Sequence, residues 1–216
     1  MAELPDVEIM RQYIDLNALR QVIEDVEVLN GSVLKGVSPE KLVETLRKNS
    51  FEESSRYGKY LFIRLRKNGW LALQFGMTGH LKYFKDLSEG PPYERLLISF
   101  TRGRHLAFAS QRKLGQVELI ASVEDYIRQH NLGPDAMSRS FDLSSFKKAL
   151  SKAKRSTVKT ALMDQSLLAG IGNVYSDEIM YQSNIHPSRR VGQLDEAMMK
   201  RLFTKTKHVL RKAIEY

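Results

Sequence analysis

Two glycines directly before a predicted helix are the residues whose type and spacing best suit the binding of an anion. The segment Ala169-Gly170-Ile171-Gly172 separates helices predicted over residues 156–168 and 173–184. Backbone N–H groups at the start of a helix point outward and attract phosphate, and glycine lets the chain approach a ligand closely. Asn173, at the start of the second helix, is a good N-cap residue. A tight glycine turn between two helices is typical of helix-turn-helix domains.

The positive charge of the chain is concentrated in the half that contains this turn. The 216 residues include 34 Lys and Arg against 25 Asp and Glu, a net charge of +9. Residues 1–138 hold 19 basic and 18 acidic residues, whereas residues 139–216 hold 15 basic and 7 acidic residues. A nearly neutral half followed by a half of net charge +8 indicates a polyanionic partner for the second half. The alternative is a solvated basic face.

Composition excludes several other kinds of chemistry. The chain has no Cys, which excludes disulfides, thiol catalysis and zinc or iron–sulfur sites held by Cys. No cluster of His, Asp and Glu has the spacing of a metal site, and we expect neither a metal nor a cofactor. No apolar run is long enough for a membrane span, and the acidic start MAELPDVEIM lacks a signal-peptide core. We therefore expect a soluble, intracellular protein.

The elements that must position these residues differ between the two halves. In the first half we expect helices over residues 5–20 and 39–48 and a hairpin at Asn30-Gly31, since both residues tolerate positive φ. Short apolar or alternating segments separated by Gly, Pro or Asn predict strands over residues 60–66, 70–75, 96–100, 105–109 and 116–120. This half is predicted to be a β-sandwich.

The second half is predicted to be helical. Helices are expected over residues 144–152, 156–168, 173–184 and 194–214, and Gly133-Pro134 is a plausible boundary. We therefore predict the α+β class, with one domain over residues 1–133 and a helical domain over residues 134–216.

Four separated segments of the chain resemble one family, the formamidopyrimidine-DNA glycosylase and endonuclease VIII enzymes of base-excision repair. The segments occur in family order across essentially the whole chain. They are AELPDVE (2–8), RYGKYL (56–61), FGMTG (75–79) and LMDQSLLAGIGNVY (162–175), which continues to NIHP (184–187). The resemblance implies an N-terminal β-sandwich followed by a helix–two-turn–helix (H2TH) domain, in agreement with the reading above.

The resemblance implies that the α-amine of Ala2, once Met1 is removed, is the nucleophile. An α-amine titrates near about 8 and a lysine near about 10.4, so far more of the α-amine is neutral at pH 7. A neutral amine can attack C1′ of a damaged nucleotide and form a Schiff base with the opened sugar, after which the strand is cut by elimination. This chain departs from the family, in which most members have Pro at this position.

Two further residues match the family's catalytic positions. Glu3 matches the general acid/base; without the resemblance, Glu3 and Asp6 are suitable first-turn residues for the following helix. Lys59 matches a lysine that contacts phosphates beside the extruded nucleotide, and its alternative role is a solvated lysine at the end of a strand.

The resemblance also implies residues that fill the space left by an extruded base. Met77 matches one such residue, although a core position at a strand end is the alternative. Arg112 matches the residue that faces the orphaned partner base. Leu114 stands where many members have Phe, and an aliphatic wedge can still enter a base step.

The remaining matches lie in the basic half. Lys159, Gly172 and Asn173 match residues that bind the DNA backbone. Glu178 matches a position associated with recognition of the damaged base, with a solvated helix charge as the alternative. His186, in the NIHP turn, is expected to be structural.

The family normally continues into a C-terminal zinc ribbon or a zinc-free equivalent, which we do not find before Tyr216. We expect a monomeric DNA glycosylase with AP lyase activity that acts on double-stranded DNA with oxidised bases or abasic sites. In a prokaryote it would be cytoplasmic and associated with the nucleoid. An inactive relative that binds damaged DNA, and a general coating protein for DNA or RNA, are the alternatives.

Overall fold

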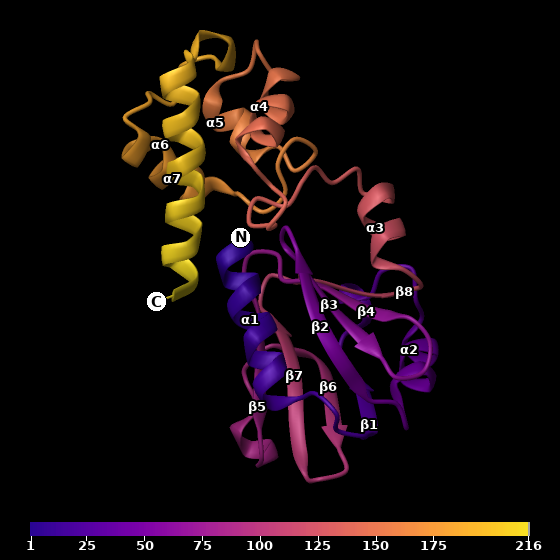
Figure 1. The fold of residues 1–216 in the computed structure, drawn as a ribbon. Helices are drawn as coiled ribbons and strands as arrows, with labels where there is room; N and C mark the ends of the chain where they lie inside the picture. Colours follow the sequence, from indigo (N-terminus) through magenta and orange to yellow (C-terminus); the bar gives the residue numbers. More distant parts are fainter. Residues whose placement is uncertain (216) are drawn as a thin grey trace. The chain divides into compact units, whose positions relative to one another are not determined.

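The computed structural model describes residues 1–215 and divides the chain into two compact units (Figure 1). The sandwich unit contains Met1–Ala2, Val7–Arg56 and Tyr60–Tyr126. The helical unit contains Glu3–Asp6, Tyr57–Lys59 and Ile127–Tyr216. Two short segments from the N-terminal half thus belong to the helical unit, while the division at residues 133 and 134 stays a prediction.

The sandwich unit is built from two four-stranded antiparallel sheets. The first has the order β1 (Ile23–Val28), β6 (Glu94–Phe100), β7 (Arg104–Ser110) and β5 (Gly79–Phe84). The second has the order β2 (Phe51–Tyr57), β3 (Tyr60–Leu65), β4 (Trp70–Gln74) and β8 (Gln116–Ile120). The predicted sandwich is confirmed.

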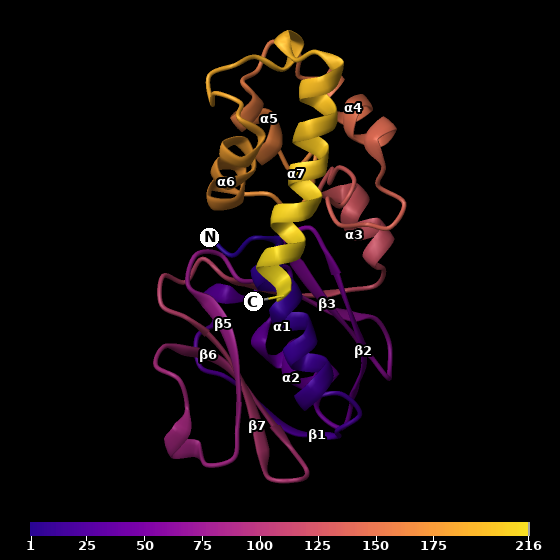
Figure 2. The same ribbon diagram turned by 60° about the vertical axis from the view of Figure 1, so that its left-hand side comes forward.

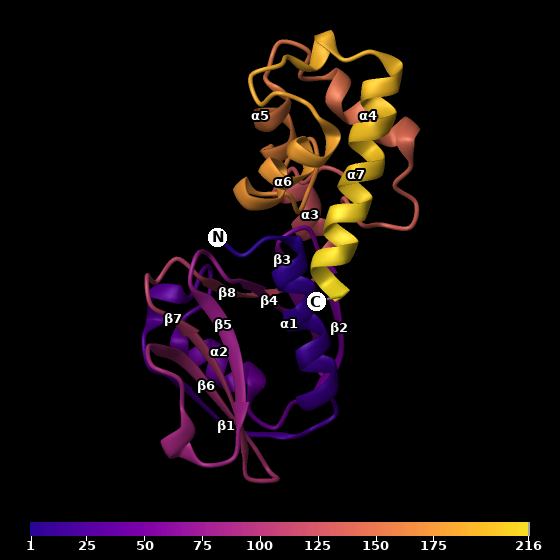
Figure 3. The ribbon, with the colours of Figure 1, turned by 90° about the vertical axis from the view of Figure 1, so that its left-hand side faces the viewer.

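Two helices complete the core of the sandwich unit. Helices α1 (Leu4–Asn17) and α2 (Pro39–Leu46) lie on opposite sides of the pair of sheets, as Figures 1 and 3 show from two directions. Alternate strand residues point inward, and they pack with apolar residues of both helices. The buried cluster includes Val7, Ile14, Leu42, Phe51, Phe75, Phe100 and Phe108. A short helix, α3 (Val123–Gln129), follows the last strand.

The helical unit contains α4 (Leu143–Ser151), α5 (Val158–Met163), α6 (Asn173–Ser183) and α7 (Glu196–Glu215). Figure 2 shows α7 running alongside α4, α5 and α6. The four helices enclose a second core that includes Phe146, Leu162, Ile179, Leu202 and Leu210, together with Leu4 from the start of α1. The 3₁₀ helices are Gly31–Val33, Leu87–Glu89 and Val191–Gln193.

Two local predictions were wrong, and a polar side chain explains each. The helix predicted over residues 156–168 ends at Met163, because the Asp164 carboxylate accepts hydrogen bonds from the Ser166 N–H and hydroxyl at 2.9 and 2.7 Å. Asn30 does not form a hairpin turn. Its φ is −153° and its side chain accepts from the Ser32 N–H, so it caps a 3₁₀ helix.

Other elements were not predicted. The strands β1, β2 and β5 and the helix α3 had no predicted counterpart, while the remaining predicted helices and strands are confirmed with ends shifted by a few residues. Within residues 1–215, no helix combines the length and the apolar character needed to cross a membrane.

Candidate active site

The nitrogen of Ala2 lies against the turn that carries Met77. It donates a hydrogen bond to the Gly76 carbonyl at 2.7 Å, and both residues belong to the sandwich unit. Gly76 has φ +61°, and a Cβ there would lie 2.5 Å from the Leu114 carbonyl oxygen. Only glycine therefore fits this position. Removal of Met1 would convert this backbone nitrogen into an α-amine.

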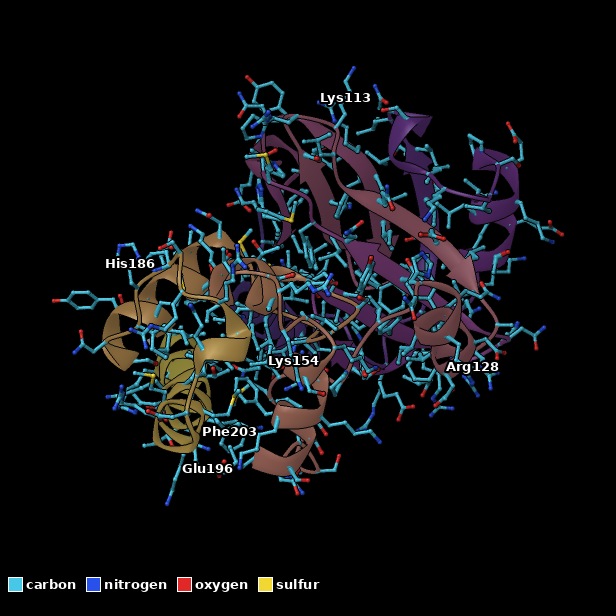
Figure 4. All side chains as sticks on the ribbon, turned by 90° about the horizontal axis from the view of Figure 1, so that it is seen from above. Lys113, Arg128, Lys154, His186, Glu196 and Phe203 are labelled. Carbon is cyan, nitrogen blue, oxygen red and sulfur yellow. The ribbon has the colours of Figure 1, made fainter. Side chains whose placement is uncertain are left out.

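The sandwich unit brings together the three residues predicted to fill the space of an extruded base. The Arg112 guanidinium donates to the Met77 sulfur at 3.1 Å, and the Arg112 N–H donates to the Thr78 hydroxyl at 3.1 Å. Met77 is 46% exposed and Leu114 is 50% exposed. The alternative of Met77 as a core residue is therefore excluded. Lys113, between Arg112 and Leu114, lies at the outer end of this turn in Figure 4.

In the helical unit, Glu3 occupies the start of α6. Its side chain is 2% exposed, and its carboxylate accepts from the N–H groups of Gly172, Val174 and Tyr175 at 2.6, 2.8 and 3.3 Å. These are the N–H groups that a helix leaves without internal partners. A carboxylate at that end also interacts favourably with the helix dipole.

Asp6 performs the first-turn role that the sequence allowed for both acids. Its carboxylate accepts from the Glu3 N–H at 2.8 Å and caps α1. Burial raises the pKa of the Tyr175 hydroxyl, and the charges of Asp6 and Glu3 add to this shift. Glu3 is therefore held by its backbone at the start of α1 and by its side chain at the start of α6.

The glycine turn before α6, residues 169–172, binds the N-terminal segment of the chain. We call this turn the glycine socket. A Cβ on Gly172 would lie 2.4 Å from the Glu3 carboxyl carbon. Gly170 has φ +117°, and its carbonyl accepts from the Leu4 N–H at 2.9 Å. Three N–H groups at this helix start are thus engaged by Glu3, so the prediction of phosphate binding here rests on the exposed Asn173. The N-cap residue is Gly172 rather than Asn173.

Lys59 is a buried lysine in the tight turn between β2 and β3. Its residue is 9% exposed, so it is not a solvated lysine. Burial lowers the pKa of its ammonium group, and the charge of Glu3 opposes that shift. Within residues 1–215, no hydrogen bond or ion pair holds the ammonium group. Because the side chain is mostly buried while its ammonium group has no hydrogen bond to any described residue, the group is suited to bind an anion that arrives from outside.

The remaining predicted residues belong to the helical unit, where Lys159 is half-buried and Glu178 and His186 are exposed. The Lys159 ammonium pairs with the Asp177 carboxylate at 2.7 Å. The exposed Glu178 accepts from the Gln182 amide at 2.6 Å. His186, on the surface in Figure 4, bonds only locally, to the Ser188 hydroxyl at 2.7 Å.

Two residues with a part in the site were missed by the sequence analysis. The Gln165 side chain binds the Met163 and Ile171 carbonyls and the Gly170 N–H, which fixes the glycine turn. Asp135 is buried and binds the turn that carries Lys59. Asp135 directly follows Gly133-Pro134, the predicted boundary, and no local pattern marks an acid as buried.

Comparisons with known proteins agree with this geometry. The model of the formamidopyrimidine-DNA glycosylase N-terminal domain matches residues 1–117, and that of the H2TH domain of the same enzyme matches residues 132–216. The chain belongs to the formamidopyrimidine-DNA glycosylase family. The predicted family, class and H2TH domain are confirmed.

Individual members of the formamidopyrimidine-DNA glycosylase family match almost the whole chain. The Arabidopsis thaliana enzyme is 32% identical over 100% of this chain and 58% of its own length. The Acaryochloris marina enzyme is 33% identical over 99% of this chain and 78% of its own. The structure of Lactococcus lactis Fpg with DNA that contains an abasic site matches with a TM-score of 0.92 and 29% identity, over 99% of this chain and 79% of that one. This chain thus spans less than two thirds of the Arabidopsis enzyme.

Proposed function

We propose that this chain is a bifunctional DNA glycosylase and AP lyase of base-excision repair. It removes oxidised bases of the 8-oxoguanine or formamidopyrimidine type from double-stranded DNA and then cuts the strand. The observation that carries this proposal is the pair of consecutive residues Ala2 and Glu3. The nitrogen of the first lies beside the Gly76 carbonyl, and the carboxylate of the second is buried at the start of α6. The related enzymes named above support it.

The reaction begins with the neutral α-amine of Ala2. Its lone pair attacks C1′ of the damaged nucleotide, the bond from C1′ to the base breaks, and the base leaves with a proton. Opening of the sugar gives an iminium ion, which acidifies the hydrogen on C2′. Loss of that hydrogen expels the 3′ phosphate and cuts the strand. Glu3, adjacent to the amine in the chain, is the group placed to exchange protons with the sugar.

The residues on the surface of each unit hold the DNA. Met77, Arg112 and Leu114 enter the space left by the extruded nucleotide, since a hole in the stack must be filled. In the helical unit, Lys59, Lys159 and Asn173 contact phosphates, and Glu178 contacts the damaged base. The protein acts on DNA as a monomer, in the cytoplasm at the nucleoid if its source is prokaryotic.

Borohydride trapping tests the proposal. The protein without Met1 is incubated with a duplex that contains one abasic site, and mass spectrometry locates the adduct. We expect a covalent complex at Ala2 and none from protein that retains Met1. Absence of an adduct from protein that lacks Met1 and binds the duplex would contradict the proposal. That result would favour an inactive relative that binds damaged DNA, consistent with Ala2 and Leu114 in place of Pro and Phe; an Ala2→Pro variant then tests whether the missing Pro is the cause.

A further inference from the structure

The position of the Lys59 ammonium depends on the backbone that carries it. Within the described residues the ammonium has no hydrogen bond or ion pair of its own, and yet the residue is buried. Because no described residue bonds to the ammonium group and most of its stem is packed, a shift of the turn would move the charge. The contacts that hold the turn over residues 57–59 therefore determine the position of the ammonium group.

Hydrogen bonds and close packing within the helical unit hold this turn. The Tyr57 hydroxyl donates to the Gly133 carbonyl at 2.8 Å. The Gly58 N–H donates to one oxygen of Asp135, Oδ2, at 2.7 Å. Gly58 has φ +55°, and a Cβ there would lie 3.0 Å from the Ala169 Cβ. The backbone thus comes close to the glycine turn of α6 at the residue before Lys59.

Asp135 is itself fixed on both sides. It is 4% exposed, and its second oxygen, Oδ1, accepts from the Met137 N–H at 2.8 Å. A buried carboxylate that accepts two backbone N–H groups makes charge-assisted bonds, which are stronger than bonds between neutral groups. It therefore ties the turn of Lys59 to the segment that follows Gly133-Pro134.

We propose that Asp135 is a positioning residue that holds the turn of Lys59 so that its ammonium group meets a phosphate of the DNA beside the lesion. The inference rests on the proposed function, because it takes damaged DNA as the ligand. According to this proposal, the buried Asp135 affects DNA binding only through Lys59. A purely structural role would change stability and leave the effect of Lys59 intact.

The test measures binding to an uncleavable duplex that carries a tetrahydrofuran abasic-site analogue, as a function of salt. Loss of one phosphate contact flattens the slope of log K against log salt by about 0.9. We expect Lys59→Ala to do so and to weaken binding about 10-fold near 0.1 M salt. Asp135→Ala is expected to have a similar effect, and Asp135→Asn a smaller one, since its amide oxygen can still accept from the Gly58 N–H.

The double variant Lys59→Ala, Asp135→Ala decides the question. If Asp135 acts through Lys59, the second substitution weakens binding less than about twofold beyond the first. Asp142→Ala is the matched control, because this exposed acid also accepts a backbone N–H in the same unit, at 2.8 Å from Ser145. We expect it to lower the melting temperature without a change of salt slope.

A folded Asp135→Ala protein with the slope of the unaltered protein would overturn the proposal, as would full additivity with Lys59→Ala. If Asp135→Ala does not fold, Tyr57→Phe replaces it, since it removes the hydroxyl that bonds to the Gly133 carbonyl and to the backbone of Asp135. It should weaken binding about threefold, and the same loss in the Lys59→Ala background, or no loss at all, would overturn the proposal. The assay measures binding and needs no turnover. The binding results can therefore be interpreted even if the protein forms no Schiff base.

Discussion

At the scale of single residues, we expect the partial burial of the Lys59 side chain to lower the stability of the free protein. Partial burial of a charge that has no hydrogen bond is unfavourable, so we expect Lys59→Met to stabilise the free protein. A gain of about 1 kcal/mol would raise the melting temperature by about 2–4 °C for a chain of this size. Calorimetry of the free protein measures the gain, and binding to the tetrahydrofuran duplex should weaken at the same time.

The pH dependence of this gain tests its cause. Burial lowers the pKa of Lys59 below its ordinary value. At a pH below the lowered pKa, the lysine is charged in both states and the folded state carries the full free-energy cost of burying the charge. As the pH rises from the lowered pKa towards about 10.4, the folded state loses the proton first. The difference between Lys59→Met and the unaltered protein should therefore shrink, and a difference that stays constant would exclude the charge as its cause.

The Glu3 carboxylate has a structural role besides the proposed chemical one. In Glu3→Gln one oxygen remains, but an NH₂ group faces N–H donors at the start of α6. We expect a loss of about 1–3 kcal/mol in stability and no removal of the base. Asp6→Asn, which weakens the cap of α1, is the control: it should be destabilising while base removal continues. Single-turnover rates with each variant shown to be folded separate the two effects.

The sequence predicts site residues by their identity and gives no information on their contacts. The order of the four motifs predicts Ala2, Glu3 and Lys59 as site residues, because family motifs carry residue identity directly. The bond between Glu3 and Gly172 joins positions far apart in the chain, and no local periodicity reports such a contact. The same limit hid Asp135.

At the scale of elements, strands with a regular apolar pattern were predicted and irregular ones were not. The strand β3 (YLFIRL) is mostly buried, whereas β2 (FEESSRY) contains charged and polar residues and only its first residue is buried. Its hydrogen-bonded neighbour in the sheet, rather than its composition, makes it a strand. The early end of α5 has a local cause instead. The Asp164 side chain forms a turn that ends the helix, although the apolar pattern of the sequence continues.

The glycine socket before α6 gives a prediction for an element as a whole. Gly172 has φ −123° and ψ −154°, so alanine there would suffer no backbone strain, only the clash with the Glu3 carboxyl group. Gly172→Ala should therefore lower the melting temperature and the rate of base removal. Combined with Glu3→Gln, its effect on stability should be less than additive.

Gly31→Ala is the control for this prediction, because its new Cβ would meet only Pro39, at an ordinary 3.7 Å. It should leave the rate unchanged. If Gly172→Ala changes neither the rate of base removal nor the stability, then Glu3 does not need the space that Gly172 leaves.

At the scale of the whole molecule, the asymmetry of charge predicts which unit dominates the non-specific affinity for DNA. Residues 139–216 carry a net charge of +8, against +1 for residues 1–138. Lys152, Lys154 and Arg155 are exposed and form no ion pair within the part of the chain that the structure describes. Counterions are released only where cations meet phosphates, so the salt slope reports which cations take part.

Replacing those three residues by Gln should flatten the salt slope for an undamaged duplex by about 2–3, if each meets a phosphate. The matched variant replaces Lys67, Arg102 and Arg104 of the sandwich unit, which are also exposed and unpaired among residues 1–215. It removes the same charge and should change the slope by less than about 1. Equal effects would mean that only the net charge matters and that the basic half is a solvated face. A larger effect of the helical variant would mean that the helical unit supplies most of the phosphate contacts to intact DNA.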